Sequence, residues 1–315
     1  RALHAQGESI NSDSNSDGST PLLAVGDLAG NVIEDTQHKV SGHLSASGGE
    51  DGVAVDWQAL APDGVYGRLQ IDPDGSWRYT PNEASPAFQG LNEGQHVIEE
   101  FLVRASSGHL APVDLLIRID LQGTNDRPTI TQGSVLTGSN REDMQTLASG
   151  QLEAVDADLD ARLHWQVDTV HGQYGELTLD AATGQWVYLL DNDRATTQRL
   201  AEGEVASEYF LASVVDEHGA TSTARLTITI IGHNDDPVIG RIDTLQATQD
   251  GGFIQGRITA TDVDTLDHLS FSTTAEVPGF TLAADGSYRF DSSNAAYQYL
   301  AEGETLQLII PVTVG

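Results

Sequence analysis

Hydrophobic and polar residues alternate along much of the chain with a period of two. Residues 68–80 alternate on both sides of a Pro-Asp-Gly turn at 73–75. Alternation that stops at a short turn and then resumes is typical of a β-hairpin. The pattern returns over residues 176–188 and 280–290, so the sequence predicts at least three hairpins of the same kind.

The hairpins belong to a tandem repeat. The motif Asn-Asp-x-Pro occurs at 125–128 and again at 234–237, an offset of 234 − 125 = 109 residues. A Leu-x-Glu-Gly motif begins at 91, 200 and 300. Self-similarity at a fixed period is the signature of a repeat architecture. We therefore predict a linker and three repeats, with these bounds: linker 1–20, repeat 1 at 21–128, repeat 2 at 129–237 and repeat 3 at 238–315.

Each repeat is expected to be a β-sandwich. Apolar runs at 115–119 and 226–231 predict closing strands of repeats 1 and 2, and repeat 3 stops before its counterpart. We therefore expect the chain to be a fragment of a longer array, since an uncovered sheet edge invites association. Short helical stretches are expected at 193–200 and 294–300. Roughly seven short strands per repeat of about 105 residues indicate all-β, antiparallel, immunoglobulin-like sandwich modules.

Composition and charge exclude several classes of protein. The chain carries 15 basic and 47 acidic residues, a net charge of −32, and no cysteine. Such a charge disfavours nucleic-acid partners and anionic membrane surfaces, both of which attract Lys and Arg. Disulfides and thiolate metal sites are impossible without cysteine. No apolar run is long enough to insert into a membrane, while 39% hydrophobic residues suffice for packed cores.

Acidic residues cluster at the repeat boundaries. Asp-x-Asp occurs at 156–158 and 262–264, close after the two Asn-Asp-x-Pro motifs. In an extended segment, residues two apart point to the same side, so two carboxylates can flank one ion. Hard oxygen ligands of this kind favour Ca²⁺. The alternative is that these residues only form turns and caps, which Asp and Asn do commonly.

Eight motifs occur in order within residues 142–237 and resemble the VCBS repeat. They are Glu-Asp, Gly-x-Leu, Val-Asp-Ala-Asp, Tyr-Gly-x-Leu-x-Leu-Asp, Gly-x-Trp-x-Tyr, Leu-Ala-Glu-Gly-Glu, Val-Asp-Glu-His-Gly and Ile-Thr-Ile-Ile-Gly-His-Asn-Asp-Asp-Pro. The resemblance covers nearly all of residues 21–315. It implies cadherin-like modules of a large bacterial RTX-type adhesin, with calcium-binding junctions between repeats.

The resemblance also implies a set of calcium ligands. At the junction of repeats 1 and 2 they would be Asn125, Asp126, Glu142, Asp143, Asp156 and Asp158. At the junction of repeats 2 and 3 they would be Asn234, Asp235, Asp250, Asp262 and Asp264. Gln249 replaces the expected Glu and removes one charge from the second junction. Repeat 1 has Ser-Ala-Ser at 45–47 where Asp-x-Asp is expected, so no complete site is implied ahead of it.

These observations predict a structural extender of a secreted or surface-anchored bacterial adhesin. Calcium would stiffen the junctions and support cell adhesion and biofilm formation. The partners would be neighbouring repeats in a longer chain and, through other parts of it, host or surface glycans and proteins. The expected location is extracellular or on the bacterial cell surface, after type I secretion. No catalytic motif is present, so we expect no enzyme.

Two alternatives stay open. In the first, one module binds a carbohydrate or a protein, and exposed aromatic residues such as Trp57 or Trp165 would be the sign. In the second, the modules accompany the catalytic domain of an extracellular hydrolase that lies outside this fragment. Trp77, Trp186 and Tyr288 recur on equivalent hairpins, which indicates core residues rather than a sugar platform.

Overall fold

The computed structural model describes residues 19–315. The protein is 45% strand and 2% helix, which confirms the predicted all-β class. The linker predicted at 1–20 lies almost wholly outside the described residues, and the first strand begins at Thr20. None of the helices in residues 19–315 is long and apolar enough to cross a membrane.

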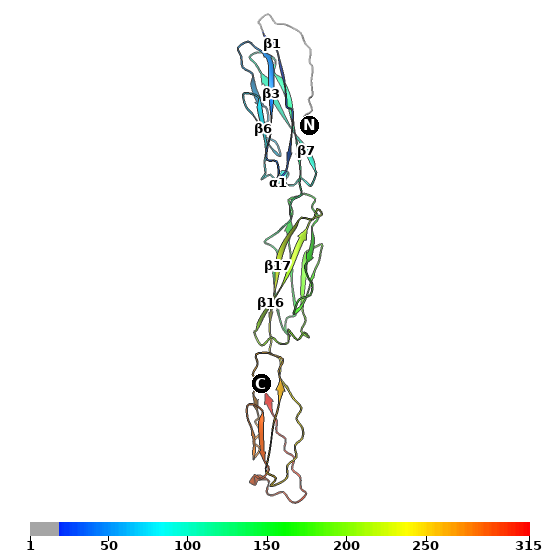
Figure 1. Cartoon of the computed structure of the whole chain (residues 1–315), viewed down its shortest axis with the longest axis vertical. Coiled ribbons are helices and arrows are strands. Elements are labelled where there is room, and N and C mark those ends of the chain that lie inside the picture. Colours follow the sequence, from blue (N-terminus) through cyan, green and yellow to red (C-terminus); the bar gives the residue numbers. More distant parts are fainter. Residues whose placement is uncertain (1–18) are drawn as a thin grey trace. The chain divides into compact units, whose positions relative to one another are not determined.

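The chain divides into two compact units. Unit 1 comprises the described residues up to Gln132 together with 153–165 and 213–223, and unit 2 comprises 133–152, 166–212 and 224–315. Both units are built from short sheets (Figure 1). The units interleave along the chain, so the repeat boundaries at 128 and 237 stay predictions.

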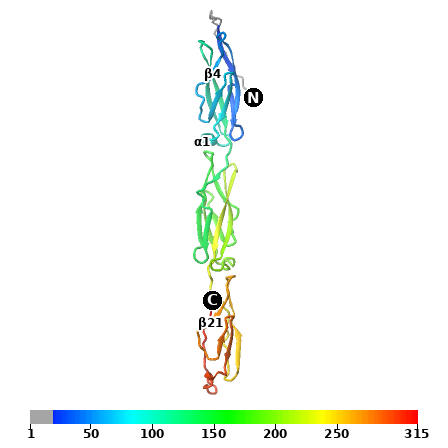
Figure 2. The ribbon, with the colours of Figure 1, turned by 90° about the vertical axis from the view of Figure 1, so that its left-hand side faces the viewer.

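Unit 1 contains a sandwich of two four-stranded sheets (Figures 1 and 2). The first has the order β1-β3-β6-β5, with strands β1 Thr20–Gly26, β3 Val40–Gly49, β6 Ser76–Pro81 and β5 Gly67–Ile71. The second has the order β2-β8-β7-β4, with strands β2 Ala29–Ile33, β8 Val113–Gln122, β7 His96–Ser106 and β4 Asp56–Ala59. The predicted hairpin at 68–80 is β5 and β6, and the predicted closing strand is β8.

One strand of the second sheet runs against the antiparallel pattern. β2 pairs with β8 in parallel, with Ile33 opposite Gln122, whereas β7 and β8 are antiparallel. Parallel strands end at the same edge of a sheet. The residues that follow β2 and β8 are therefore neighbours, and the backbone N–H of Glu34 donates to the carbonyl of Gln122 at 2.9 Å.

The core of unit 1 lies between the two sheets and contains several large aromatic side chains. Trp77 and Tyr79 of the first sheet and Phe101 of the second are almost fully buried. Trp57 and Trp165 are also buried, at 9% and 5% exposure. They occupy the corresponding strands β4 and β13, so the idea of a surface role for either tryptophan is wrong. Their burial follows from alternation, which turns each of them inward.

The same sheets recur further along the chain. The order β10-β17-β16-β13 matches the second sheet of unit 1, with strands β10 Thr137–Arg141, β17 Thr221–Ile231, β16 Val205–Val215 and β13 His164–Val167. β10 is again parallel to β17. The three-stranded sheet β11-β15-β14 contains β11 Leu147–Gln151, β15 Gln185–Leu190 and β14 Gly175–Leu179. A two-stranded sheet pairs β9 Thr129–Ile130 with β12 Ala154–Val155.

Repeat 3 has fewer strands. Its sheet β19-β23-β22 contains β19 Phe253–Arg257, β23 Ser287–Asp291 and β22 Phe280–Leu282. Two further pairs are β18 Val238–Ile239 with β20 Ala260–Thr261, and β21 Phe271–Ser272 with β24 Thr313–Val314. Within residues 238–315 no strand corresponds to β17. Leu306, Leu308 and Ile309 are accordingly exposed, since no closing strand covers them.

The helices are only single turns. A 3-10 helix, η1, spans Ala295–Tyr297 within the stretch predicted at 294–300, and a four-residue helix, α1, spans Pro86–Gln89 in repeat 1, where none was predicted. Residues 193–200 form hydrogen-bonded turns without a helix. Too few consecutive residues are available for helix propagation to outweigh nucleation.

Candidate metal centres

Carboxylates gather in two places, each inside one compact unit. The first cluster, in unit 1, consists of Glu34, Asp35, Asn125, Asp126, Asp156, Asp158 and Asp216. The second cluster, in unit 2, consists of Glu142, Asp143, Asn234, Asp235, Asp262 and Asp264. The two clusters are built from corresponding motifs of successive repeats, and we keep these names below.

In the first cluster, the parallel strands place an acidic residue beside the Asn-Asp motif. Glu34 follows β2 and is completely buried. Its Oε2 accepts the backbone N–H of Thr124, at 3.0 Å, and its Oε1 accepts Nε2 of Gln89, at 3.2 Å. Asp35 has φ of 58°, a left-handed backbone that a short polar side chain tolerates. The chain thereby turns sharply after a buried carboxylate.

The Asp-x-Asp segment meets the Asn-Asp motif through the backbone. Oδ2 of Asp158 accepts the N–H of Asp126 at 2.8 Å, and Oδ1 of Asp156 accepts the N–H of Asp158 at 3.1 Å. Asp158 is 8% exposed. The segment is thus a tight turn rather than the extended strand that we expected. Its two carboxylates nevertheless reach the same cluster, because the turn bends them around the Asp126 backbone.

Several buried oxygens in this cluster accept no hydrogen bond from the protein. They are Oδ2 of Asp126, Oδ2 of Asp156 and Oδ1 of Asp158. A buried charged oxygen without a partner is costly, so such groups are normally hydrogen-bonded, paired with a charge or bound to a metal. The three orphaned oxygens therefore indicate a missing positive charge.

A buried carboxylate elsewhere in unit 1 provides a contrast. Glu99 is 9% exposed, and its two oxygens accept the Tyr66 N–H at 3.0 Å and the Tyr79 hydroxyl at 2.7 Å. No partner is lacking there. Burial alone therefore does not leave carboxylate oxygens without donors in this fold, and the orphaned oxygens are a property of the cluster.

Mutual repulsion and burial shift the acidities in the first cluster. Burial, followed by the charges of Asp126 and Asp35, raises the pKa of Glu34 to about 7. Burial together with the charges of Asp35 and Asp158 raises the pKa of Asp126 to about 6. Burial also raises the pKa of Asp156 and Asp158. A cation in the middle would remove this repulsion.

Asp216 completes the first cluster and was not among the predicted ligands. One carboxylate oxygen accepts Nδ2 of Asn125, at 2.9 Å, and the other accepts the N–H groups of His218 and Ala220. Burial alone would raise the pKa of Asp216, but these hydrogen bonds hold it below the ordinary value. Asp216 therefore remains ionised. Glu93 also contributes here, since its Oε2 accepts the N–H of Asn125 at 2.8 Å.

The second cluster repeats these contacts. Oδ2 of Asp264 accepts the N–H of Asp235 at 2.8 Å, and Oδ1 of Asp262 accepts the N–H of Asp264 at 2.9 Å. Oδ2 of Asp235 and Oδ1 of Asp264 are buried without a hydrogen-bond donor, and Asp264 is 4% exposed. Burial, followed by the charges of Asp235 and Asp143, raises the pKa of Glu142 to about 7.

Oxygens of Asp262, Asp264 and Asp267 lie within 4.8 Å of one another, close enough to hold one metal ion. Asp267 was not among the predicted ligands, although it lies only three positions beyond the Asp-x-Asp motif. The turn after Asp264 brings it back toward the pair.

The structure groups the predicted residues differently from the sequence expectation. Asn125, Asp126, Asp156 and Asp158 lie together, as do Asn234, Asp235, Asp262 and Asp264. Glu142 and Asp143 do not join the first group. They belong to the second, because β10 carries them along β17 to the end where Asn234 lies; the N–H of Glu142 donates to the Ile231 carbonyl at 3.0 Å.

Asp250 is displaced in the same way. Its carboxylate accepts Nε2 of Gln298 at 2.9 Å, beside η1, instead of joining Asn234 and Asp235. In repeat 1 the corresponding glutamine, Gln89, donates to Glu34. Glu34 follows the end of β2 and therefore lies at the opposite end of the repeat from the start of that strand. The Glu-Asp motif thus serves the end of its own repeat. The sequence contained this motif, but its proximity to the preceding junction was misleading.

The donor set of both clusters fits Ca²⁺. All the charged groups are carboxylates, supplemented by asparagine and backbone oxygens, and hard cations with 6–8 ligands prefer such oxygens. The chain has no cysteine, and the group of carboxylates that lie within 4.8 Å of one another, Asp262, Asp264 and Asp267, contains no histidine. His233 lies beside the second cluster, where its backbone N–H donates to Oε2 of Glu142 at 3.2 Å. A softer transition metal would find few of its usual ligands.

The family comparison agrees with this arrangement. Residues 125–232 match the model of the bacterial cadherin-like domain. The chain contains a cadherin-like module. The match begins at Asn125 of the first cluster and covers most of the repeat predicted at 129–237. Among curated proteins, none matches the chain.

Solved cadherin structures resemble the fold of this chain. Human CDH23 EC21-23 aligns with a TM-score of 0.51 at 14% identity, over 84% of this chain and 88% of that one. Protocadherin Gamma B7 extracellular cadherin domains 1-4 align at 16% identity and a TM-score of 0.47, over 84% and 65%. The protocadherin GammaB4 extracellular domain aligns at 15% identity and 0.45, over 87% and 46%. The chain thus spans two thirds or less of these two protocadherin structures, and the likeness concerns the fold alone.

Proposed function

We propose that this cadherin-like chain is a calcium-stiffened spacer of an extracellular adhesive protein. The observation that carries the proposal is the set of buried aspartate oxygens without donors in both clusters. In the first cluster these oxygens belong to Asp126, within the 125–128 segment that separates predicted repeats 1 and 2, and to Asp156 and Asp158 of repeat 2. Glu34 of repeat 1 lies near enough to Asp126 and Asp158 for their charges to raise its pKa. One cation would therefore tie residues of two successive repeats together.

The mechanism is electrostatic. Without a cation, Glu34, Asp126 and Asp158 repel one another, and the segment between them is under strain from like charges. With Ca²⁺, the same oxygens share one divalent cation, and bending at the segment would break metal–oxygen bonds. The Ca²⁺-bound segment becomes stiff, so that repeats in series form a spacer instead of a flexible chain.

Extracellular use follows from affinity. Calcium sites of extracellular modules have a Kd of roughly 10⁻⁴–10⁻³ M, which leaves them empty in a cytosol and filled outside. The proposal therefore includes secretion, with type I export, and a place on the bacterial surface in an RTX-type adhesin that contributes to adhesion and biofilm formation. Contacts with glycans or proteins would be made by other parts of the parent protein. No catalytic role is included.

The test is thermal unfolding of the chain in chelator and in Ca²⁺ titrated to about 10 mM, with Mg²⁺ as the control for charge screening. At about 100 times Kd, a bound ligand stabilises the folded state by about 2.7 kcal/mol per site. We expect a calcium-specific rise in melting temperature. Small-angle scattering on the same samples should show a stiffer particle.

Matched variants identify the sites. Asp156→Ala with Asp158→Ala should remove the response of the first cluster to Ca²⁺. Asp72→Ala, which removes an acidic residue from a hairpin turn, should leave this response unchanged. If Ca²⁺ and Mg²⁺ act alike, or if the double variant responds as the parent does, the carboxylate clusters are ordinary turn chemistry and the spacer mechanism is wrong.

A further inference from the structure

A glutamine occupies the same turn in all three repeats. Gln89, Gln198 and Gln298 each stand two positions before the leucine of the Leu-x-Glu-Gly motif. Each directly follows a buried residue, Phe88, Thr197 or Tyr297, at 0%, 0% and 6% exposure. The buried neighbour fixes the turn against the core, so the glutamine side chain starts from a defined position.

In repeats 1 and 2 this glutamine reaches the buried glutamate of the cluster. Nε2 of Gln89 donates to Oε1 of Glu34 at 3.2 Å, and Nε2 of Gln198 donates to Oε1 of Glu142, also at 3.2 Å. The other oxygen of each glutamate accepts a backbone N–H, from Thr124 at 3.0 Å and from His233 at 3.2 Å. Both glutamates are completely buried. Each carboxylate is therefore held by one N–H on each oxygen.

This pattern of donors leaves capacity for a metal. A carboxylate has about four lone-pair sites, and two N–H donors use two of them. The remaining sites are available to a cation. Without the amide, the buried carboxylate would lose half of its donors and the charged form would be disfavoured.

Repeat 3 provides a natural comparison. The glutamate position is Gln249, and it is exposed. Nε2 of Gln298 donates instead to Oδ1 of Asp250 at 2.9 Å, and Nε2 of Gln249 donates to Oε1 of Gln298 at 3.1 Å. The glutamine thus turns to other partners where the buried glutamate is missing. Its contact with glutamate accompanies the carboxylate clusters and is not a general requirement of the turn.

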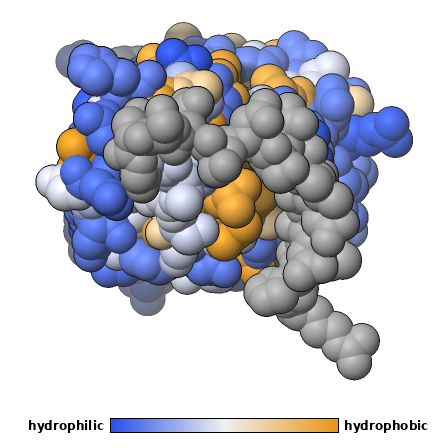
Figure 3. Space-filling model, turned by 90° about the horizontal axis from the view of Figure 1, so that it is seen from above, coloured by the Kyte–Doolittle hydropathy of each residue, from blue (hydrophilic) through white to orange (hydrophobic). Residues whose placement is uncertain are grey.

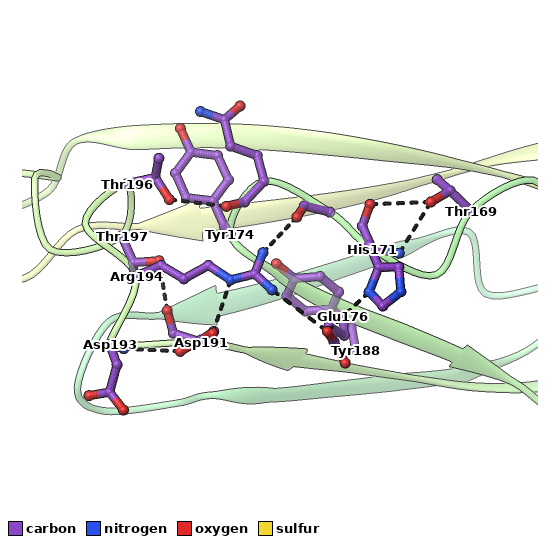
Figure 4. A network of polar contacts seen from close by, with 12 residues as sticks. Thr169, His171, Tyr174, Glu176, Tyr188, Asp191, Asp193, Arg194, Thr196 and Thr197 are labelled. Atoms are coloured by element: carbon purple, nitrogen blue, oxygen red, sulfur yellow. Dashed lines mark hydrogen bonds and ion pairs between the residues drawn. The ribbon is translucent and has the colours of Figure 1, made fainter.

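The turn of repeat 2 is anchored separately from the glutamine. Arg194 lies at the centre of a polar network, and its Nε donates to Oδ2 of Asp191 at 2.9 Å (Figure 4). One further guanidinium nitrogen of Arg194 donates to the carbonyl of Gly172 at 2.6 Å, and the hydroxyl of Thr197 donates to the carbonyl of Asp191 at 2.9 Å. These contacts hold the turn without Gln198. Loss of the Gln198 amide should therefore affect the cluster more than the fold.

We propose that Gln89 and Gln198 are positioning residues of the two calcium sites, which orient Glu34 and Glu142 and keep them available to the ion. The inference rests on the proposed function, since it assumes that the clusters bind Ca²⁺. It adds a pair of residues that donate to a ligand and do not themselves touch the metal, and such outer contacts commonly tune metal affinity by 10- to 100-fold.

The experiment separates the two sites by using variants that retain one cluster each. Calorimetric titration with CaCl₂ is carried out on Gln89→Met in an Asp264→Ala background, and on Gln198→Met in an Asp158→Ala background. Methionine matches glutamine in length but donates no hydrogen bond. We expect each methionine variant to weaken calcium binding about tenfold relative to its own background.

Melting in chelator distinguishes positioning from a structural role. The methionine variants should keep the melting temperature of their backgrounds in chelator within about 2 °C, equivalent to about 0.5 kcal/mol, while binding weakens. Gln298→Met, in either background, is the matched control and should not change affinity. Unchanged affinity in both Gln→Met variants, or an equal loss with Gln298→Met, overturns the positioning role. If the two backgrounds themselves bind no Ca²⁺, the proposed function fails instead.

Unit 1 also has an apolar depression of about 300 Å³, lined by Pro21, Leu22, Leu110, Pro112 and Val113. The space-filling view shows hydrophobic residues among hydrophilic ones (Figure 3). Nothing in the structure shows what would cover the depression.

Discussion

The two carboxylate clusters share their local contacts and differ in one distant one. In both, the second aspartate of Asp-x-Asp accepts the N–H of the Asn-Asp motif, and a buried glutamate accepts a glutamine amide. Only the first cluster contains an aspartate from the turn between β16 and β17, Asp216, which is 91 positions from its partner Asn125.

This difference shows which contacts of the clusters come from the repeated motifs and which depend on the closing strands. The shared hydrogen bonds join segments that every repeat contains, so they recur. Asp216 arrives only with the turn that joins two long strands, and Asn125 then has a side-chain partner that Asn234 does not have. The two clusters thus obtain their additional carboxylate from different places, the first from Asp216 and the second from Asp267, three positions after Asp264.

The largest expected effect concerns pH, to which both clusters should respond alike. Burial raises the pKa of Glu34 and of Glu142 to about 7 from 4.5, so the folded state retains protons that the unfolded chain loses above pH 4.5. In chelator, the free energy of unfolding should therefore fall as pH rises from about 5 to about 8, by up to about 3 kcal/mol per glutamate. Urea unfolding at several pH values measures this.

A matched variant and calcium sharpen the pH experiment. Glu34→Gln should remove the part of the fall in unfolding free energy that comes from the first cluster. Saturating Ca²⁺ should abolish the whole fall, because it holds the carboxylates ionised. A stability that rises with pH in chelator would contradict the burial of these two groups.

The next effect distinguishes the clusters by removing one charge from each. Asp158→Asn and Asp264→Asn keep the shape of the side chain but remove a ligand charge next to an orphaned oxygen. Each should weaken one site about a hundredfold, or about 2.7 kcal/mol, and leave the other unchanged. Calorimetric titration of the two variants measures both sites. Loss of both sites from either single change would mean that the clusters are not independent.

A smaller effect tests the role of Asp216. Asp216→Asn removes the additional carboxylate while an amide oxygen can still accept the N–H of His218 and Ala220. The affinity of the first cluster should fall about tenfold, or about 1.4 kcal/mol. Titration in the Asp264→Ala background isolates the site. An unchanged affinity would show that Asp216 does not contribute to the site.

The smallest effect concerns a surface ion pair found only in the second cluster. Arg141 donates to Oε1 of Glu202, whereas Ile33 occupies the corresponding position in repeat 1. Both side chains are more than one third exposed, so Arg141→Ala should change stability by less than about 0.5 kcal/mol. Removal of the positive charge should slightly strengthen calcium binding at the second cluster. Arg225→Ala, which removes a positive charge away from the clusters, is the control.

Much of the fold followed from alternation and repetition. The hairpins at 68–80 and 176–188 and the closing strands β8 and β17 are where the pattern predicted them, since every second side chain is buried. The helices were overestimated because tight turns and short helices use the same residues. The burial of Trp57 and Trp165 was missed, because their equivalence depends on the strand pairing of β4 and β13.

The candidate site was predicted in part. Asn125 and Asp126 form one short motif and Asp156 and Asp158 another, and the two motifs meet where the N–H of Asp126 donates to Asp158, 32 positions further along the chain. Asp216 and Glu93 were missed, because their approach to Asn125 depends on strands that begin and end far away in sequence. The repeated Leu-x-Glu-Gly motif was a visible signal for Glu93 but carried no information about its partner.

The sequence by itself determined the all-β class, the period of the repeat and the acidic character of the boundaries, since these depend on residue type and short spacing. Only the tertiary structure decided which carboxylates meet. Glu34 and Glu142 lie five strand residues beyond the start of β2 and β10, and the parallel pairing of these strands with β8 and β17 carries them to the far end of the repeat. Strand direction is a property of chain pairing over about 90 residues, which no local motif specifies.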